Sequence, residues 1–102
     1  MRRGSTPTHT FALPACIAEK ASAISAIEIT YEQKNQVILQ KREQDCTING
    51  DEVSVTLSQE ETFLFKEDVN VQIQLRIKVD GKVIPSDIMR VSCKECLSDE
   101  VI

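Results

Sequence analysis

The sequence predicts an all-β protein: an immunoglobulin-like antiparallel β-sandwich of about seven strands with one short helical turn. Three observations lead to this prediction. Residues 69–79 alternate strictly between aliphatic and polar side chains; the dipeptides Asn49-Gly50 and Asp80-Gly81 favour tight hairpin turns; and short apolar runs are separated by turn residues about every 8–12 positions. A sandwich covers the apolar faces of two sheets, which a single sheet cannot do.

The strand over residues 69–79 organises the rest of the chain. Its odd positions are all Val, Ile or Leu, and its even positions are polar or charged, so one face is buried and the other faces water. Asp80-Gly81 suits a type I′ turn, in which both central residues have positive φ, and a second apolar run follows over residues 83–91. Pro85-Ser86-Asp87 interrupts that run and predicts a bulge or kink in the second strand of this hairpin.

The remaining strands are predicted from shorter alternating segments. We expect, in chain order, an edge strand over 6–13 that starts at Pro7, a hairpin over 26–42 with its turn at 34–36, and strands over 46–48 and 53–57 joined by Asn49-Gly50. Residues 15–23 are rich in alanine, but their apolar pattern is too short to assign to an element.

One helical turn is predicted from a capping box. Ser58 and Glu61 have the spacing at which a Ser side chain binds a free amide of the first turn while the Glu side chain bonds back to the Ser amide. We expect Phe63 and Phe65 to anchor this turn to the sheet. The chain is long enough for one domain over residues 1–102, with loose ends at 1–5 and 97–102.

Charge and hydropathy argue against two classes of partner. Twelve basic and sixteen acidic residues give a net charge of −4, which a nucleic-acid backbone repels. The adjacent basic pairs Arg2-Arg3 and Lys41-Arg42 carry no interleaved aromatic residues. No apolar run reaches the ~20 residues that span a bilayer, and no apolar stretch of signal-peptide length follows the basic start. We therefore expect neither a nucleic-acid partner nor a membrane partner.

Cysteine chemistry is the sharpest candidate for a metal site. Cys93 and Cys96 form a CxxC motif, and structural zinc needs four ligands, which Cys16 and Cys46 would complete. Those two do not form a second close pair, and His9 is the only alternative ligand of its kind. Without an export signal we expect four unpaired thiols, with Cys46 and Cys93 in the core, and no cofactor. A redox role is less favoured because the motif follows a strand rather than beginning a helix.

No catalytic set is evident. His9 is the sole histidine and is predicted to lie on the surface, so a Ser-His-Asp or Cys-His arrangement cannot be drawn. Capping explains Glu61 in the pair Glu60-Glu61, and Asp51-Glu52 follows a turn as solvated charge. The chain is predicted not to be an enzyme.

The even positions of the 69–79 strand form a candidate interaction face. These side chains could dock another subunit, or they could be the solvent-facing side of a sheet: Gln72, Gln74, Arg76 and Lys78. The expected edge strand over 6–13 could likewise pair with a partner chain.

Seven sequence segments, in consistent order along nearly the whole chain, are informative about family: Thr6-Pro7-Thr8-His9-Thr10-Phe11, Leu13-Pro14, Ile29-Thr30-Tyr31, Asp45-Cys46, Val53-Ser54-Val55, Leu57-Ser58-Gln59-Glu60-Glu61-Thr62 and Val71-Gln72-Ile73-Gln74. Together these segments resemble short proteins of prophage regions in Gram-positive bacteria, which are similar to the immunoglobulin-like N-terminal domain of tailed-phage baseplate upper proteins. The segments are strand and turn residues, so they specify a fold better than a function.

The resemblance implies a non-enzymatic structural or adaptor module of a phage tail or baseplate. Its partners would be other phage structural proteins or further copies of itself. It would occupy the cytoplasm of the bacterial host during production and then the virion. A carbohydrate- or receptor-binding sandwich is the alternative, although one Tyr, three Phe and no Trp offer few stacking platforms for sugars. A zinc-stapled domain using the CxxC motif is the third possibility.

Overall fold

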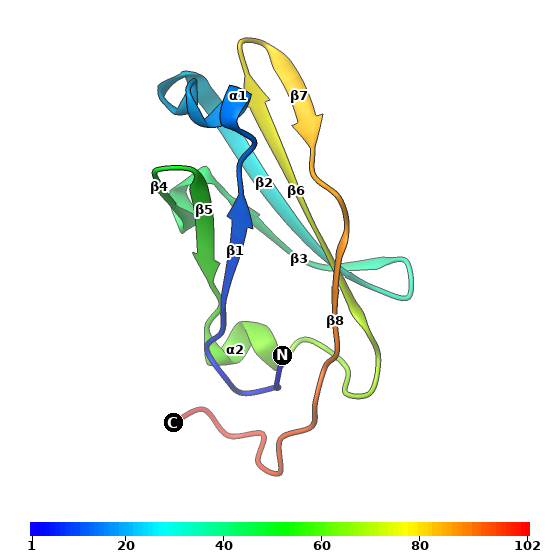
Figure 1. Cartoon of the computed structure of the whole chain (residues 1–102). Helices are drawn as coiled ribbons and strands as arrows, with labels where there is room; N and C mark the ends of the chain where they lie inside the picture. Colours follow the sequence, from blue (N-terminus) through cyan, green and yellow to red (C-terminus); the bar gives the residue numbers. More distant parts are fainter.

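The computed structural model describes residues 1–102 as two antiparallel sheets packed face to face, with short helical turns at their ends (Figure 1). One sheet has the order β1-β5-β4, and the other has the order β3-β2-β6-β7 with β8 also paired to β6. The strands are β1 (Thr8–Ala12), β2 (Ile24–Gln33), β3 (Gln36–Arg42), β4 (Cys46–Asn49), β5 (Glu52–Thr56), β6 (Val71–Val79), β7 (Lys82–Pro85) and β8 (Met89–Val91).

The prediction of an all-β sandwich is confirmed. Eight strands replace the expected seven or so. Four short helical turns replace the one expected: α1 (Ala15–Ala18), η1 (Ala21–Ala23), η2 (Glu43–Asp45) and α2 (Gln59–Thr62). The chain changes sheet between β1 and β2, between β3 and β4, and between β5 and β6. The term immunoglobulin-like therefore describes only the two-sheet architecture. The chain has no tryptophan and so lacks the Cys…Trp…Cys pattern of antibody domains. No helical segment has the length and apolar character needed to cross a bilayer.

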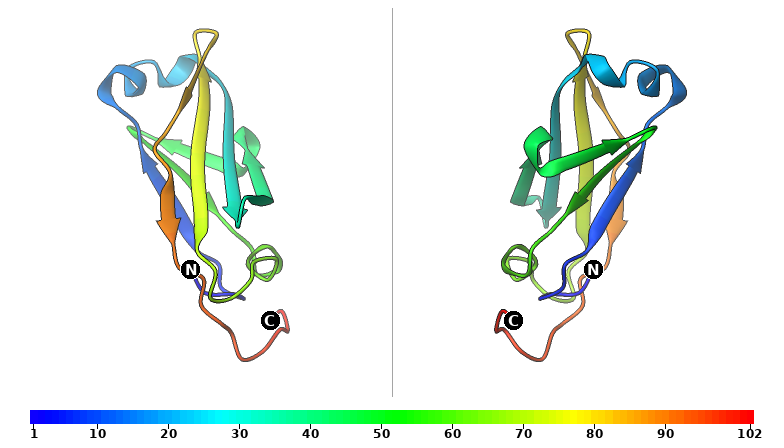
Figure 2. Two further views of the ribbon diagram at one scale, coloured as in Figure 1. Left: turned by 90° about the vertical axis from the view of Figure 1, so that its right-hand side faces the viewer. Right: turned by 90° about the vertical axis from the view of Figure 1, so that its left-hand side faces the viewer.

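The central strand of the larger sheet is β6, and its alternation is as predicted. All five odd residues from Val71 to Val79 are buried, and the even residues are half-buried or exposed. The strand begins two residues later than the pattern suggested. It pairs with β2 on one side and with β7 and β8 on the other (Figure 2). Because β6 is paired on both sides, it is the central strand to which the rest of the five-stranded sheet is attached.

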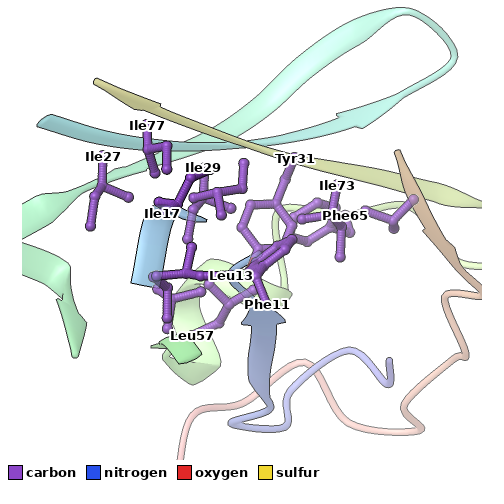
Figure 3. Packing of buried hydrophobic residues seen from close by; sticks show 14 of the residues in the cluster. Phe11, Leu13, Ile17, Ile27, Ile29, Tyr31, Leu57, Phe65, Ile73 and Ile77 are labelled. Carbon is purple, nitrogen blue, oxygen red and sulfur yellow. The ribbon is translucent and has the colours of Figure 1, made fainter. Parts of the chain in front are cut away.

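The core lies between the two sheets. Figure 3 shows Ile27, Ile29 and Ile77 of the larger sheet facing Leu13 and Leu57 from the smaller-sheet side. Near the other end, Tyr31 and Phe65 meet edge to face, with ring centroids 5.8 Å apart. Each aliphatic side chain removed from water in this layer contributes about 1.5–3 kcal/mol to folding. The core is thus mainly aliphatic, with an aromatic group at one end.

Three hairpin turns use positive φ. Lys34 and Asn35 have φ of 49° and 64°, and Asp80 and Gly81 have φ of 51° and 76°, as type I′ turns require. The turn predicted at Asn49-Gly50 is shifted. Asn49 pairs with Glu52, so the loop residues are Gly50 and Asp51, and only Gly50 has positive φ, at 62°. This pattern is that of a type II′ turn, whose first central residue is glycine.

The capping box before α2 is confirmed. The Ser58 amide donates to Oε1 of Glu61 at 2.8 Å, and the Glu61 amide donates to the Ser58 hydroxyl at 3.2 Å. Phe65 is buried in the core as expected. Phe63 is not: it is half-buried and its ring lies 5.4 Å from the guanidinium of Arg3. The residues left unassigned, 15–23, form α1 and η1, and Ile17 of α1 is buried at one end of the sandwich.

The expectation of a loose N-terminus is wrong. The amine of Met1 donates to the carbonyl of Ser92 at 2.8 Å, and Arg2 forms a parallel bridge with Lys94. The Gly4 amide donates to the hydroxyl of Thr62, a buried side chain, at 2.9 Å. Sequence patterns missed this segment because its contacts are with residues far away in the chain. Residues 97–102 form no helix or strand, as expected, although the Gln59 side chain bonds to both backbone groups of the last residue.

The predicted interruption of the last hairpin is present. Strands β7 and β8 both pair with β6, but residues 86–88 between them do not belong to a strand. At this break the Ser86 amide donates to the carbonyl of Leu75 at 2.7 Å, and the Leu75 amide donates to the Ser86 hydroxyl at 3.0 Å. The side-chain oxygen takes the place of a carbonyl in the ladder. This lets the chain leave the sheet and return one residue out of register.

Candidate interaction surface

The predicted interaction face lies on the outer side of the five-stranded sheet. Gln72 and Gln74 are half-buried, and Arg76 and Lys78 are exposed. Strand register places Glu32, Thr30 and Glu28 of β2 directly beside the first three of these residues. The four side chains therefore share one face with neighbouring polar side chains, because even positions of paired strands point to the same side.

An ion cluster that the sequence reasoning did not identify orders one end of this face. Glu28 accepts hydrogen bonds from two arginines on the flanking strands, Arg76 on β6 and Arg42 on β3. Arg76 reaches Oε1 through Nε at 2.9 Å and through Nη2 at 2.6 Å, and Arg42 reaches Oε2 at 2.7 Å. The hydrogen bond from Arg76 is the largest of the effects that hold the pKa of Glu28 below its ordinary value. The only sequence signal was that a Glu and two Arg occupy outward positions, and the register that joins them is non-local.

Two shallow hollows lie on the outer face. The first, of about 150 Å³, is lined by Glu28, Arg42, Arg76 and Lys78 together with apolar residues such as Val83. The second, of about 70 Å³, lies among Thr30, Glu32, Gln72, Gln74 and Ile88. Three large aliphatic side chains on or beside this sheet are exposed: Val37, Val83 and Ile88. The face thus combines fixed charges, amide groups and apolar contacts, which is the mixture found in protein interfaces.

A seam runs between the two sheets where β1 approaches residues 86–89. Two adjoining hollows of about 310 and 320 Å³ line it, and both include Ala12, Ser86 and Asp87. The Leu13 amide donates to Asp51 and the Leu57 amide donates to Pro7, so the odd residues of β1 bond to β5. In an antiparallel ladder the amides and carbonyls of the even residues then point away from β5. The edge strand expected over 6–13 therefore exists, and its outer side has no strand partner.

The four cysteines do not form a cluster. Cys93 is buried, Cys46 and Cys96 are half-buried, and Cys16 is exposed. No disulfide joins them, and no three His, Cys, Asp or Glu side chains converge in a way that could hold a metal ion. Cys93 is a core residue, and Cys46 packs against the core from its edge. Burial raises the pKa of both of these thiols, which keeps them protonated.

The prediction that His9 lies on the surface is wrong. His9 occupies an inward-facing position of β1, is half-buried, and lies with Nδ1 2.7 Å from the hydroxyl of Tyr31. Burial lowers the pKa of His9 and raises the pKa of the fully buried Tyr31. A signal for this placement was present in the sequence, because His9 alternates with the same period as the apolar residues Phe11 and Leu13 and so shares their side of the strand.

The remaining acidic candidates do not form a paired site. Glu61 caps α2, while Glu60 beside it is exposed. Asp51 and Glu52 are exposed at the turn between β4 and β5. These carboxylates are therefore not placed as a pair that could act on opposite sides of one substrate bond.

Comparisons with models of known protein families, with curated proteins and with solved structures gave no match to this chain.

Proposed function

We propose that this chain is a non-enzymatic structural or adaptor module that joins a larger assembly through protein–protein contacts on the outer face of its five-stranded sheet. The observation that carries the proposal is the cluster at Glu28, which holds Arg42 and Arg76 in fixed positions before any partner arrives. Side chains that are already ordered lose less conformational entropy on binding. Exposed aliphatic residues beside them supply apolar contact area.

The free outer edge of β1 supports the same proposal. An unpaired edge strand can accept another strand by main-chain hydrogen bonding. The strand sequence Thr8–Ala12 contains no Lys, Arg, Asp, Glu or Pro, the residues by which proteins usually protect such an edge. A module with one side-chain face and one strand edge offers two kinds of contact to neighbouring subunits.

Within this class, we propose a phage tail or baseplate as the assembly, with other phage structural proteins or further copies of this chain as partners and the virion as final location. The support for this narrower proposal is the resemblance of the strand and turn phrases noted above. The β-sandwich fold is compatible with it.

The test is particle fractionation. Prophage induction in the encoding organism, followed by density-gradient purification of particles, is expected to place the chain in the tail-containing fractions by mass spectrometry. Neighbouring tail and baseplate genes would support the same conclusion. A chain that stays at the top of the gradient while tail proteins sediment, or that lies among metabolic genes, would remove the basis for the phage assignment.

The carbohydrate-binding alternative finds no support in the placement of the aromatic residues. Phe11, Tyr31 and Phe65 are buried, and Phe63 is half-buried beside Arg3. Sugar recognition usually depends on an exposed aromatic ring, and the outer face presents none. Saturable binding on a glycan array would favour this alternative.

A further inference from the structure

The hollow at the Glu28 cluster has more hydrogen-bond donors than Glu28 can use. A guanidinium carries five N–H groups. Arg76 donates two of these groups to Glu28, and Arg42 donates one. Three N–H groups of Arg76 and four of Arg42 therefore remain free of Glu28. The side chains of Arg42 and Arg76 are 49% and 53% exposed, so these remaining donors are accessible from solvent.

Lys78 adds a third cation to the same hollow. It lies two residues beyond Arg76 on β6, on the same outer face, and no ion pair engages its amine. Alternate residues of a strand are about 6.6–6.8 Å apart. The lining of the hollow therefore carries three positive charges and one negative charge, although the chain as a whole has a net charge of −4.

We propose that this hollow binds an acidic segment of a protein partner, in extended conformation, with Asp or Glu at alternate positions. An extended segment places the carboxylates of alternate residues on one side with the same ~6.6–6.8 Å spacing as Arg76 and Lys78. Arginine offers a planar pair of N–H groups to each carboxylate, which makes the contact directional as well as electrostatic. The inference rests on the proposed function, since it names the partner chemistry of the same face.

A short polypeptide fits this site better than a nucleic acid does. The carboxylates of Glu43 and Asp45 lie at the end of β3, where they accept hydrogen bonds from the amides of Ile27 and Arg42. A long polyanion crossing the hollow would meet these negative charges and the acidic remainder of the surface. A segment of a few residues would contact the three cations alone.

Fluorescence anisotropy with labelled peptides tests the inference. The probe is acetyl-Thr-Glu-Thr-Glu-Thr-Glu-amide. The matched control peptide has the same composition in the order Glu-Glu-Thr-Thr-Glu-Thr, in which no two Glu residues are two positions apart. We expect saturable binding of the alternating peptide that weakens as salt concentration rises, and at least threefold weaker binding of the control peptide. Amide chemical-shift changes are expected to centre on β2, β3 and β6.

Charge-removing variants locate the site. Arg76→Gln should weaken binding about tenfold and Lys78→Gln about threefold, because a bidentate guanidinium contact is stronger than a single exposed ammonium contact. Arg90→Gln is the matched control, since Arg90 faces Gln72 at the other end of the face. We expect it to change affinity by less than about 1.5-fold. Lys78→Gln removes no ion pair within the chain, so its result does not depend on whether Arg76→Gln perturbs the fold.

Three outcomes would overturn the inference: no saturable binding of the alternating peptide, an equal effect of Arg90→Gln and Lys78→Gln, or tighter binding of a single-stranded oligonucleotide at the same residues. The inference and the proposed function fail separately. Sedimentation with tail particles without peptide binding would refute only the acidic-segment inference. Peptide binding by a chain absent from those particles would refute only the phage assignment.

Discussion

Lys41 and Glu61 form an ion pair that joins the two halves of the sandwich, with Nζ 2.5 Å from Oε2. Lys41 is on β3 of the five-stranded sheet, whereas Glu61 is in α2, which follows the smaller sheet. The other oxygen of Glu61 accepts the Ser58 amide, so one carboxylate both caps the helix and binds the lysine. Burial raises the pKa of Glu61, but the hydrogen bonds from Lys41 and Ser58 outweigh it and leave the pKa below its ordinary value.

This pair should contribute measurably to stability. Its side chains are only 13% and 23% exposed, so water screens the charges less than at an open surface. In a double-mutant cycle of Lys41→Met and Glu61→Gln, we expect a coupling energy of about 1.5 kcal/mol from urea unfolding. Glu60→Gln is the control and should stay within about 0.5 kcal/mol of the wild type. A coupling below about 0.3 kcal/mol would show that the pair does not hold the halves together.

Neighbouring substitutions on β6 test the register of the sheet. Ile73 is fully buried, so Ile73→Ala should lower the free energy of unfolding by about 2–5 kcal/mol through lost burial and the cavity left behind. Gln72 points outward and makes no side-chain hydrogen bond within the chain, so Gln72→Ala should cost less than about 1 kcal/mol. Equal costs for the two substitutions would contradict the assignment of inner and outer faces.

The burial of His9 predicts a pH dependence of stability near neutrality. Burial, and then the positive charge of the amino terminus, lower the pKa of His9 below its ordinary value of 6.5. The unfolded chain therefore binds the proton more readily, and stability should fall as pH drops below about 6.5. The pKa values of Glu28, Glu43 and Glu61 lie below 4.5, so stability tied to these carboxylates is lost only at more acidic pH.

Urea unfolding at pH 7.5 and pH 5.5 measures this effect. The wild type should be less stable at pH 5.5, and the difference should shrink in His9→Gln, which cannot bind the proton. A difference of the same size in both proteins would mean that another group is responsible.

Metal analysis tests the alternative of a zinc-stapled domain. Because Cys93 is in the core and the thiols do not converge, purified protein should contain well under one zinc per chain. A chelator should leave the thermal unfolding midpoint unchanged, since no metal would be lost on unfolding. Stoichiometric zinc, or a midpoint lowered by the chelator, would restore the CxxC motif as a metal site.

Elements set by local patterns were predictable from the sequence. The alternation of β6 follows from side-chain direction in a strand, the turn at Asp80-Gly81 from the φ that glycine and aspartate tolerate, and the Ser58-Glu61 cap from amides within one helical turn. Each depends on residues close together in the chain. The sandwich architecture was also predictable, since it is the arrangement that buries so many one-sided strands.

The candidate site was predictable only in part. The alternation of polar and apolar residues along β6 predicted that Arg76 and Lys78 lie on one face. The Glu28 cluster depends instead on which strands are neighbours and in which register they pair, and no local sequence pattern encodes that. The attachment of Met1 near Ser92 was missed for the same reason. At Gly50 the motif was correctly identified as a turn, but strand register decided which residues form the loop.

The pairing of β2 with β6 has a consequence for how the chain folds. The neighbouring pairs β2–β3, β4–β5 and β6–β7 are joined by tight turns and can close within microseconds. The β2–β6 contact instead joins positions such as Glu28 and Arg76, which are 48 residues apart. The chain loses the conformational entropy of closing this long loop before the β2–β6 contacts can stabilise it. The docking of the preformed hairpins should therefore set the folding rate. Substitutions that destabilise the tight turns should then slow refolding more than they speed unfolding, because the turns are already formed when the hairpins meet.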